Sequence, residues 1–322
     1  MLWPDAHAAA PEAAPLPDAR LRLLFVCAHP AIDAGLHSAL MLQAVLGLDA
    51  ARIASAFLVK PEAMTKRLVR AKAKIRDAGL RFEEPGPDEW PERLASVLEA
   101  IYGAYTLHWG LADAGELASE ARFLAELVAS QLPHEPEALG LVALLWLCEA
   151  RRTARSEAFR PLHEQDPSAW DAPLIAQADA ALRRAAAQRA PGPFQLEAAI
   201  QAAHTQGRID GRVPWDGITR LHERLLEMAP TVGARIAHAV ALAHALSDPT
   251  AGLRLLDAIE AARVAAHQPW WAARAHLLAM AGRHADAAAA YGRALALTVE
   301  PRLRAWLAQR LHAEEIARTA AD

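Results

Sequence analysis

Apolar residues along most of this chain recur every three or four positions, which is the spacing of one face of an α-helix. Between residues 18 and 79 the pattern predicts four short helices, separated at Pro30, at Gly47 and at the Val59-Lys60 turn. Their inward-facing positions are Leu21, Leu24 and Phe25, then Leu36, Leu40 and Val45, then Ile53, Ala54 and Phe57, and finally Met64, Leu68, Ala71 and Ile75.

The third and fourth of these helices carry end signals. Asp49 is a good N-cap for the third helix, and Pro61 suits the first position of the fourth, which spans 61–78. Two helices joined by so short a turn, the second of them basic, are typical of a helix-turn-helix.

Beyond residue 80 the same periodicity predicts helices over 94–105, 114–132, 136–156 and 172–189. Two proline-rich breaks, RFEEPGPDEWPE (81–92) and APGP (190–193), divide this part of the chain. We therefore predict a flexible linker at 1–17, a helix-turn-helix domain at 18–80, a helical domain at 81–190 and a helical-repeat domain at 191–322.

The last of these domains shows a faint internal repeat. Small and large residues alternate between positions 271 and 294 in the order that a tetratricopeptide repeat requires, and a degenerate copy precedes it. Helix pairs of this kind need Ala or Gly where they cross and large side chains where they interlock. An ordinary alanine-rich bundle is the alternative. The repeat positions are Trp271, Ala275, Gly282, Ala287, Tyr291 and Ala294, with Ile236, Val240, Gly252 and Leu256 upstream.

Composition agrees with an all-α fold. Apolar residues make up 53% of the 322 residues but aromatic ones only 6%, so Ala and Leu dominate, and both favour helices. Two cysteines are too few for a disulfide framework. No apolar run reaches the roughly 20 residues needed to span a bilayer, and the N-terminus lacks the pattern of a signal peptide. These features predict a cytoplasmic protein without a membrane partner.

We also expect Trp215, Trp270, Trp271 and Trp306 to anchor helix pairs in the core.

Charge is distributed unevenly along the chain. The net charge is −4, yet residues 60–79 contain seven basic residues against two acidic ones. On a helical wheel, Lys66, Arg67, Arg70 and Lys74 form one arc, named here the basic arc, beside the apolar stripe. Repulsion along Lys66, Arg70 and Lys74 at i,i+4 spacing is relieved if a polyanion binds there.

In a helix-turn-helix the N-terminal half of the second helix reads base edges and the rest binds phosphates. The predicted base-reading residues are Thr65, Lys66, Arg67 and Arg70, and the predicted phosphate-binding residues are Lys72, Lys74 and Arg76. A solvated basic face without a partner is the alternative.

The stretches DARLRLLFVCAHPAID and LGLDAARIASAFLVKPEAMTKRLVRAKAKIRDAG resemble the promoter-reading region of extracytoplasmic-function sigma factors, RNA polymerase subunits for transcription initiation. The resemblance is to the subgroup with a long helical C-terminal extension. It continues through RFEEP, HEPEALGLVALLWLCEARRTAR, HEQDPSAWD and PGPFQLEAAIQAAH to the tetratricopeptide-like tail. It implies recognition of a minus-35-like promoter element, and it matches family motif positions at Ile53-Ala54, Arg67-Leu68 and 70–72.

The chain also departs from this family. The resemblance implies the RNA polymerase core as a partner, but the polymerase-binding and promoter-melting helices that precede the reader in that family have no counterpart before residue 18. The chain is then either a fragment or a stand-alone reader, and in both cases we do not expect it to melt DNA by itself. YTLHWG (105–110) stands where an Asn-Glu-Gly-Tyr-like motif is usual, and SDPT (247–250) stands where Asp-Gly-Pro is usual. Because these two motifs differ, we do not transfer to this chain any regulatory role that the C-terminal extension has in the family.

Two other groups of polar residues were considered as a metal site and a catalytic site, and neither matches a known pattern. Cys27, His29, Asp33 and His37 match no standard zinc spacing, and Cys27 fits better as a small buried residue. In the HEQD loop (163–166) we expect Asp166 and Trp170 to hold the loop against the helices rather than to catalyse a reaction. We therefore expect no catalytic residues, no metal and no cofactor. A different function remains open, that of a helical-repeat scaffold for a protein or peptide, with a vestigial helix-turn-helix.

Overall fold

The structure is a computed structural model and describes residues 18–57, 59–77, 79, 84–107, 114–155 and 158–321. Throughout these residues the regular elements are helices, and no strand occurs among them, which confirms the all-α prediction. The predicted linker at 1–17 lies outside the described residues. The chain divides into two compact units, Met1–Gln131 (unit 1) and Leu132–Asp322 (unit 2), which are described separately. The predicted boundaries at 80 and 190 fall within these units and stay predictions.

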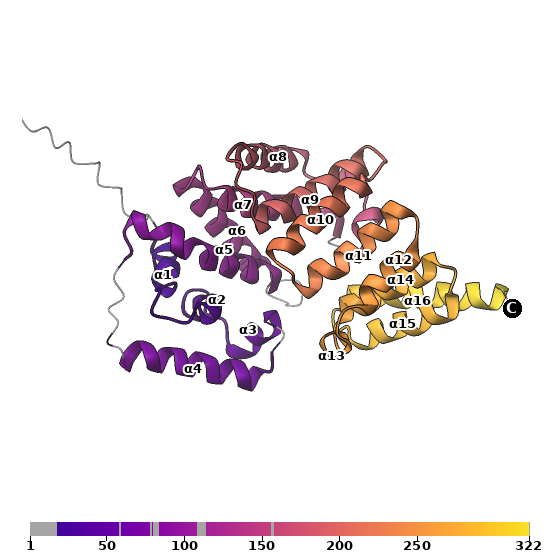
Figure 1. Ribbon diagram of the computed structural model, residues 1–322, viewed down its shortest axis with the longest axis horizontal. Coiled ribbons are helices and arrows are strands. Elements are labelled where there is room, and N and C mark those ends of the chain that lie inside the picture. The colour runs from indigo at the N-terminus through magenta and orange to yellow at the C-terminus, as the bar shows by residue number, and fades with distance from the viewer. Residues whose placement is uncertain are drawn as a thin grey trace, which may run out of the picture. The chain divides into compact units, whose positions relative to one another are not determined.

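Unit 1 contains six α-helices among its described residues and a short 3-10 turn, η1 (Figure 1). Helix α5 packs against α1, α2, α3 and α6, and is therefore the central helix of the unit. The elements are α1 (Ala19–Cys27), α2 (Ala34–Ala44), α3 (Ala50–Ala56), α4 (Pro61–Asp77), η1 (Pro87–Glu89), α5 (Trp90–Leu107) and α6 (Ala114–Gln131).

Side-chain caps explain where the first helices begin. The Asp18 carboxylate accepts hydrogen bonds from the backbone N–H groups of residues 20 and 21 at the start of α1. Asp33 does the same for Gly35 in α2, and Asp49 accepts from the N–H of Arg52 at 2.8 Å, so the predicted cap of α3 is confirmed.

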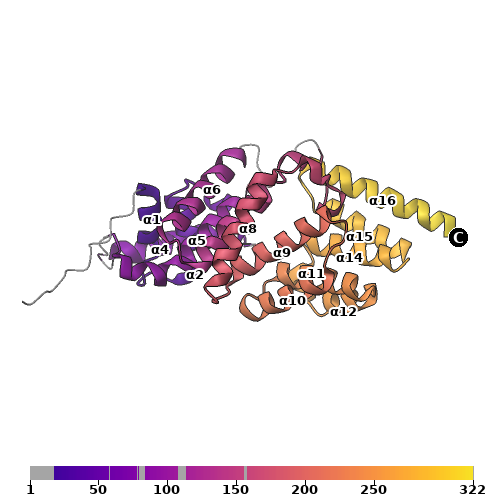
Figure 2. The ribbon, with the colours of Figure 1, turned by 90° about the horizontal axis from the view of Figure 1, so that it is seen from above.

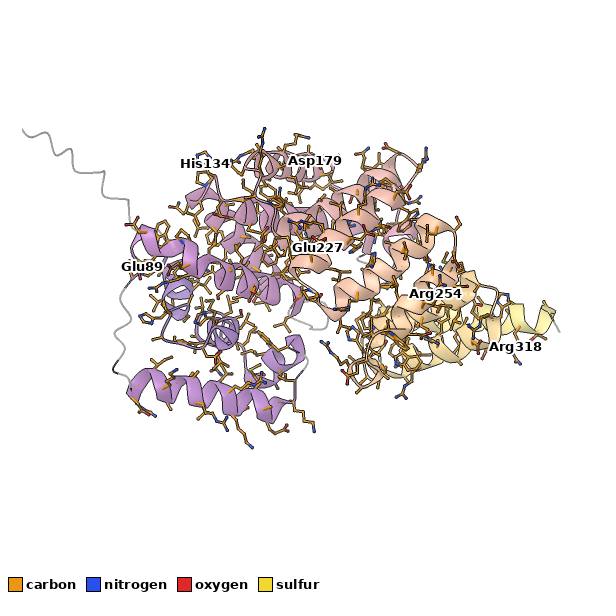
Figure 3. All side chains as sticks on the ribbon, viewed as in Figure 1. Glu89, His134, Asp179, Glu227, Arg254 and Arg318 are labelled. Carbon is orange, nitrogen blue, oxygen red and sulfur yellow. The ribbon has the colours of Figure 1, made fainter. Side chains whose placement is uncertain are left out.

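Contacts of two α5 side chains, Arg93 and Trp90, attach α1 to α5. The Arg93 guanidinium is only 4% exposed, donates to the carbonyl of Phe25 at 3.1 Å, and pairs with Glu89, which is labelled in Figure 3. The ring of Phe25 packs 5.9 Å from that of Trp90. Because a buried charge without partners would be costly, Arg93 fixes the place where α1 lies on α5.

Unit 2 contains ten α-helices among its described residues. Helix α7 packs on α8 and α9, and from α9 to α16 successive helices pack mostly on their neighbours in the chain (Figure 2). The helices are α7 (Pro136–Glu149), α8 (Ala172–Ala187), α9 (Pro193–Ile209), α10 (Trp215–Met228), α11 (Val232–Leu246), α12 (Pro249–Asp257), α13 (Ala261–Val264), α14 (Gln268–Met280), α15 (His284–Ala296) and α16 (Pro301–Ala321). Three 3-10 turns, η3 (Thr153–Arg155), η4 (Leu162–Glu164) and η5 (Pro167–Ala169), lie between α7 and α8.

Helix α7 is buried over most of its surface and makes a close backbone contact with α9. A Cβ on Gly140 would lie 2.5 Å from the backbone nitrogen of Gln195, so only glycine fits at this crossing. The Glu137 carboxylate accepts the N–H groups of Phe194 and Gln195, both at 3.0 Å, and satisfies free donors at the start of α9. The predicted helix 136–156 is too long: α7 ends at Glu149, where the Ala150 carbonyl accepts the N–H of Asp171.

Two apolar clusters form most of the remaining core of unit 2. One joins α9, α10 and α11, and the other joins α11 through α16. Of the tryptophans expected in the core, Trp270 is buried at 8% exposure, whereas Trp215, Trp271 and Trp306 are half-buried. The indole N–H of Trp306 donates to Glu164, which also pairs with Arg310.

Candidate functional site

Helix α4 lies at the margin of unit 1, with α2 and α3 on one side (Figure 1). Its apolar stripe is buried as predicted: Met64, Leu68, Ala71 and Ile75 are between 1% and 9% exposed. Since these four residues follow the i, i+4, i+7, i+11 spacing, one narrow face of the helix packs on the unit. The wider remainder of α4 is available to solvent within this unit.

The predicted site residues all lie on this part of α4, and all of them are exposed. They are Thr65, Lys66, Arg67, Arg70, Lys72, Lys74 and Arg76.

Few contacts among the described residues neutralise the basic side chains of α4. Arg76 lies 3.7 Å from Asp77, with both side chains at least 75% exposed. An ion pair so exposed contributes little. Among the described residues the side chains of the basic arc make no ion pair or hydrogen bond. Of the predicted base readers, Thr65 is engaged locally, because its hydroxyl donates to the carbonyl of Pro61 at 3.0 Å.

The order of charges along α4 suits the helix itself. Glu62 lies in the first turn, and Lys74 and Arg76 lie in the last turn, where each opposes the partial charge of its helix end. Val69 is 61% exposed among the basic residues. The outer face therefore combines positive charge with one apolar side chain.

A small pocket beside α4 was not foreseen from the sequence. It has a volume of about 170 Å³ and lies between α4 and the segment that connects α1 to α2. Arg70 and Lys74 border it together with Asp33, over a floor formed by Ile32, Leu36 and neighbouring apolar residues. Its existence depends on how α2 meets α4, which helical periodicity does not reveal.

One predicted inward-facing position next to α4 is wrong. Phe57 was predicted to face inward with Ile53 and Ala54, but it is 37% exposed, whereas those two are buried. The reason is that α3 ends at Ala56, so Phe57 belongs to the turn and no longer follows the helical face.

The structure does not bring the side chains of Cys27, His29, Asp33 and His37 together as a set of metal ligands. Cys27 is 3% exposed, and burial raises the pKa of its thiol to about 11, which disfavours the thiolate that binds metals. The ring of His37 is hydrogen-bonded to Ser96 and to the backbone carbonyl of Ile32. In the described part of the chain no group of three or more His, Cys, Asp or Glu side chains is placed to hold a metal ion.

In the HEQD loop, Asp166 accepts the N–H of Ser168 at 2.9 Å, and Trp170 is 6% exposed. Trp170 is therefore buried as expected, whereas Asp166 is exposed and its hydrogen bond lies within the loop and does not reach the helices. None of the helices among the described residues has the length and apolar character required to cross a bilayer.

Comparison with known proteins gives the family of the chain. Residues 93–186 match the model of a family described as "Family of unknown function (DUF6596)". A protein of Rhizobium meliloti (strain 1021), with the printed name "Uncharacterized protein R00370", is 35% identical over 299 residues, which cover 90% of this chain and 70% of that protein. No solved structure matches significantly. On this identity and coverage, the chain belongs to the same protein family as R00370 of Rhizobium meliloti.

Proposed function

We propose that this chain is a transcription-initiation protein of the sigma-factor type that binds promoter DNA through α4. The observation that carries the proposal is the exposed basic arc beside a buried apolar stripe. Helix α4 has one face that fixes it to unit 1 and another that offers cations to a partner. The resemblance to extracytoplasmic-function sigma factors supports a minus-35-like promoter element as that partner.

Electrostatics favours a polyanion as the partner. Lys66, Arg70 and Lys74 repel one another along the helix, which costs a few tenths of a kcal/mol for each pair. The described residues supply no carboxylate partner to any of the three. A DNA backbone relieves the repulsion and releases its condensed counterions, which provides most of the affinity of such interfaces.

The proposal includes a finer description of the fold. In it, α3 and α4 are the two helices of a helix-turn-helix, and the α11–α12 and α14–α15 pairs are tetratricopeptide-like repeats. Unit 2 then contacts a protein partner, and the protein acts in the cytoplasm with RNA polymerase. Support for the repeat comes from the small residues at helix crossings: Ala275, Ala287 and Ala294 are fully buried.

The alternative function is a helical-repeat scaffold that binds a protein or peptide. The half-buried aromatic side chains of unit 2, Trp215 and Trp271 among them, favour it. On that alternative, α4 has no duplex to bind, and its charges matter only for solubility.

The test uses the full chain and duplex DNA selected from a random library. If Arg67 or Arg70 makes a bidentate contact with guanine, replacing it by Ala weakens binding to the selected duplex by about 1–3 kcal/mol and relaxes the preference at that base. Arg183, an exposed arginine on α8, provides the matched control, and R183A is expected to bind like the parent. Failure to select any sequence, or equal footprints for R67A, R70A and the parent, would overturn the proposal in favour of the scaffold.

A further inference from the structure

Two histidines in unit 2 face each other across neighbouring helices. The Nε2 atoms of His244, on α11, and His276, on α14, are 3.1 Å apart. Helices α11 and α14 pack against each other (Figure 2), and both imidazoles are half-buried, so solvent reaches the pair. Nothing in the proposed function uses these side chains.

The position of His244 is fixed from several sides. The indole of Trp215 stacks on its ring, with centroids 4.2 Å apart and planes within 10°. The backbone is held at the end of α11, where the N–H of Asp248 donates to the carbonyl of Ala243. The ring therefore has one face covered by the indole while its Nε2 points at His276.

The spacing between α11 and α14 is fixed by α12. A Cβ on Gly252 would lie 2.7 Å from the carbonyl oxygen of Ala239 on α11 and 2.8 Å from the Cδ1 of Leu277 on α14. Such close packing prevents the two helices from moving independently. The two imidazoles are consequently held near each other by the core and not only by their own contact.

Facing Nε2 atoms can share either a proton or a metal ion. Two nitrogens that bind one zinc ion at about 2.0–2.1 Å with tetrahedral angles are about 3.3 Å apart, close to the spacing observed here. When both rings carry their proton on Nδ1, both Nε2 lone pairs point into the same gap, which only a cation stabilises. Imidazole is a preferred ligand of Zn²⁺, Cu²⁺ and Ni²⁺.

We propose that His244 and His276 form a two-histidine site for an imidazole-preferring divalent transition-metal ion, with water at its other coordination positions. Since no third His, Cys, Asp or Glu in the described residues completes the group, the site binds more weakly than a structural zinc centre. A bound ion links α11 to α14. The proposal does not depend on DNA binding by α4.

The experiment adds Cu²⁺ to the full chain, because Cu²⁺ binds nitrogen ligands most tightly among these ions and gives an electron paramagnetic resonance signal. We expect one specific ion per chain, with hyperfine structure from two imidazole nitrogens, and quenching of the Trp215 indole that W215F abolishes. Each of H244Q and H276Q is expected to weaken binding by at least about tenfold, because each removes one of two protein ligands. Gln keeps a hydrogen-bonding group at either position.

His312, which is 74% exposed on α16, supplies the control for weak binding to surface histidines, and H312Q is expected to bind Cu²⁺ like the parent. Binding that is equal in the parent, H244Q and H276Q would overturn the proposal. So would a spectrum of the unaltered protein with fewer than two imidazole nitrogens on the tightest-bound ion. That second measurement decides the question even if a variant fails to fold.

Discussion

Gly252 on α12 offers a sharp test of how the helices of unit 2 pack. A methyl group at this position would lie 2.7 Å from the carbonyl oxygen of Ala239, 2.8 Å from the Cδ1 of Leu277 and 2.9 Å from the Cβ of Ala243. The first of these contacts is with backbone, which cannot rotate away. G252A must therefore displace α12 from α11.

Two opposing effects set the size of the change. Replacing Gly by Ala inside a helix stabilises it by up to about 1 kcal/mol through backbone propensity. Overpacking a close crossing costs about 1–3 kcal/mol, and three contacts under 3.0 Å place Gly252 at the upper end of that range. We expect G252A to lower the free energy of unfolding by about 2 kcal/mol.

Gly292 on α15 is the matched control. It lies inside a helix, and a Cβ there would meet no atom within 4 Å, so only the propensity effect remains. G292A is expected to raise the free energy of unfolding by up to about 1 kcal/mol. Urea unfolding of the full chain, followed by tryptophan fluorescence and circular dichroism, measures both variants. Equal stabilisation by G252A and G292A would refute the close crossing.

Three further changes test other contacts. Leu68→Ala removes a side chain that is 3% exposed under α4 and is expected to destabilise unit 1 by about 2–5 kcal/mol in urea unfolding, unlike V69A on the exposed face. Glu137→Ala leaves two N–H groups at the start of α9 without acceptors and should cost about 1–2 kcal/mol, with Glu137→Gln milder, because an amide oxygen still accepts. Burial lowers the pKa of His222 to about 4 from 6.5, so the unfolded chain binds the proton more tightly and stability falls as the pH drops from about 6.5 to 4. Replacing His222 by Phe should flatten that part of a pH series of melting temperatures, and an unchanged pH dependence would count against the shift.

The sequence was sufficient to predict an all-α chain, many of its helices before residue 190 and the two faces of α4. Periodicity alone identified Met64, Leu68, Ala71 and Ile75 as buried, because local i, i+4 spacing decides which face of a helix is apolar. Asp49 was recognised as a cap for the same reason: a cap acts on residues only two or three positions away.

Contacts between distant segments were not predictable. The pocket beside Arg70 and Lys74 requires the α1–α2 connection to lie next to α4. The histidine pair requires two residues separated by 32 positions to meet, and nothing in the local pattern at His244 or His276 marks them. The end of α7 was missed because Asp171, far along the chain, satisfies the carbonyl of Ala150.

The family relationship and the helical fold leave open what α4 binds, and the salt dependence of DNA affinity tests that most directly. The proposal predicts that log K for the selected duplex falls linearly with log salt, and that K72A/K74A/R76A, which removes the three predicted phosphate-binding residues, reduces the slope by about 2–3, since each phosphate contact contributes about 0.9. The control R183A/R212A/R235A removes the same charge from exposed positions of unit 2 and should keep the parent slope. Identical slopes and affinities for the parent and the α4 variant would contradict the account.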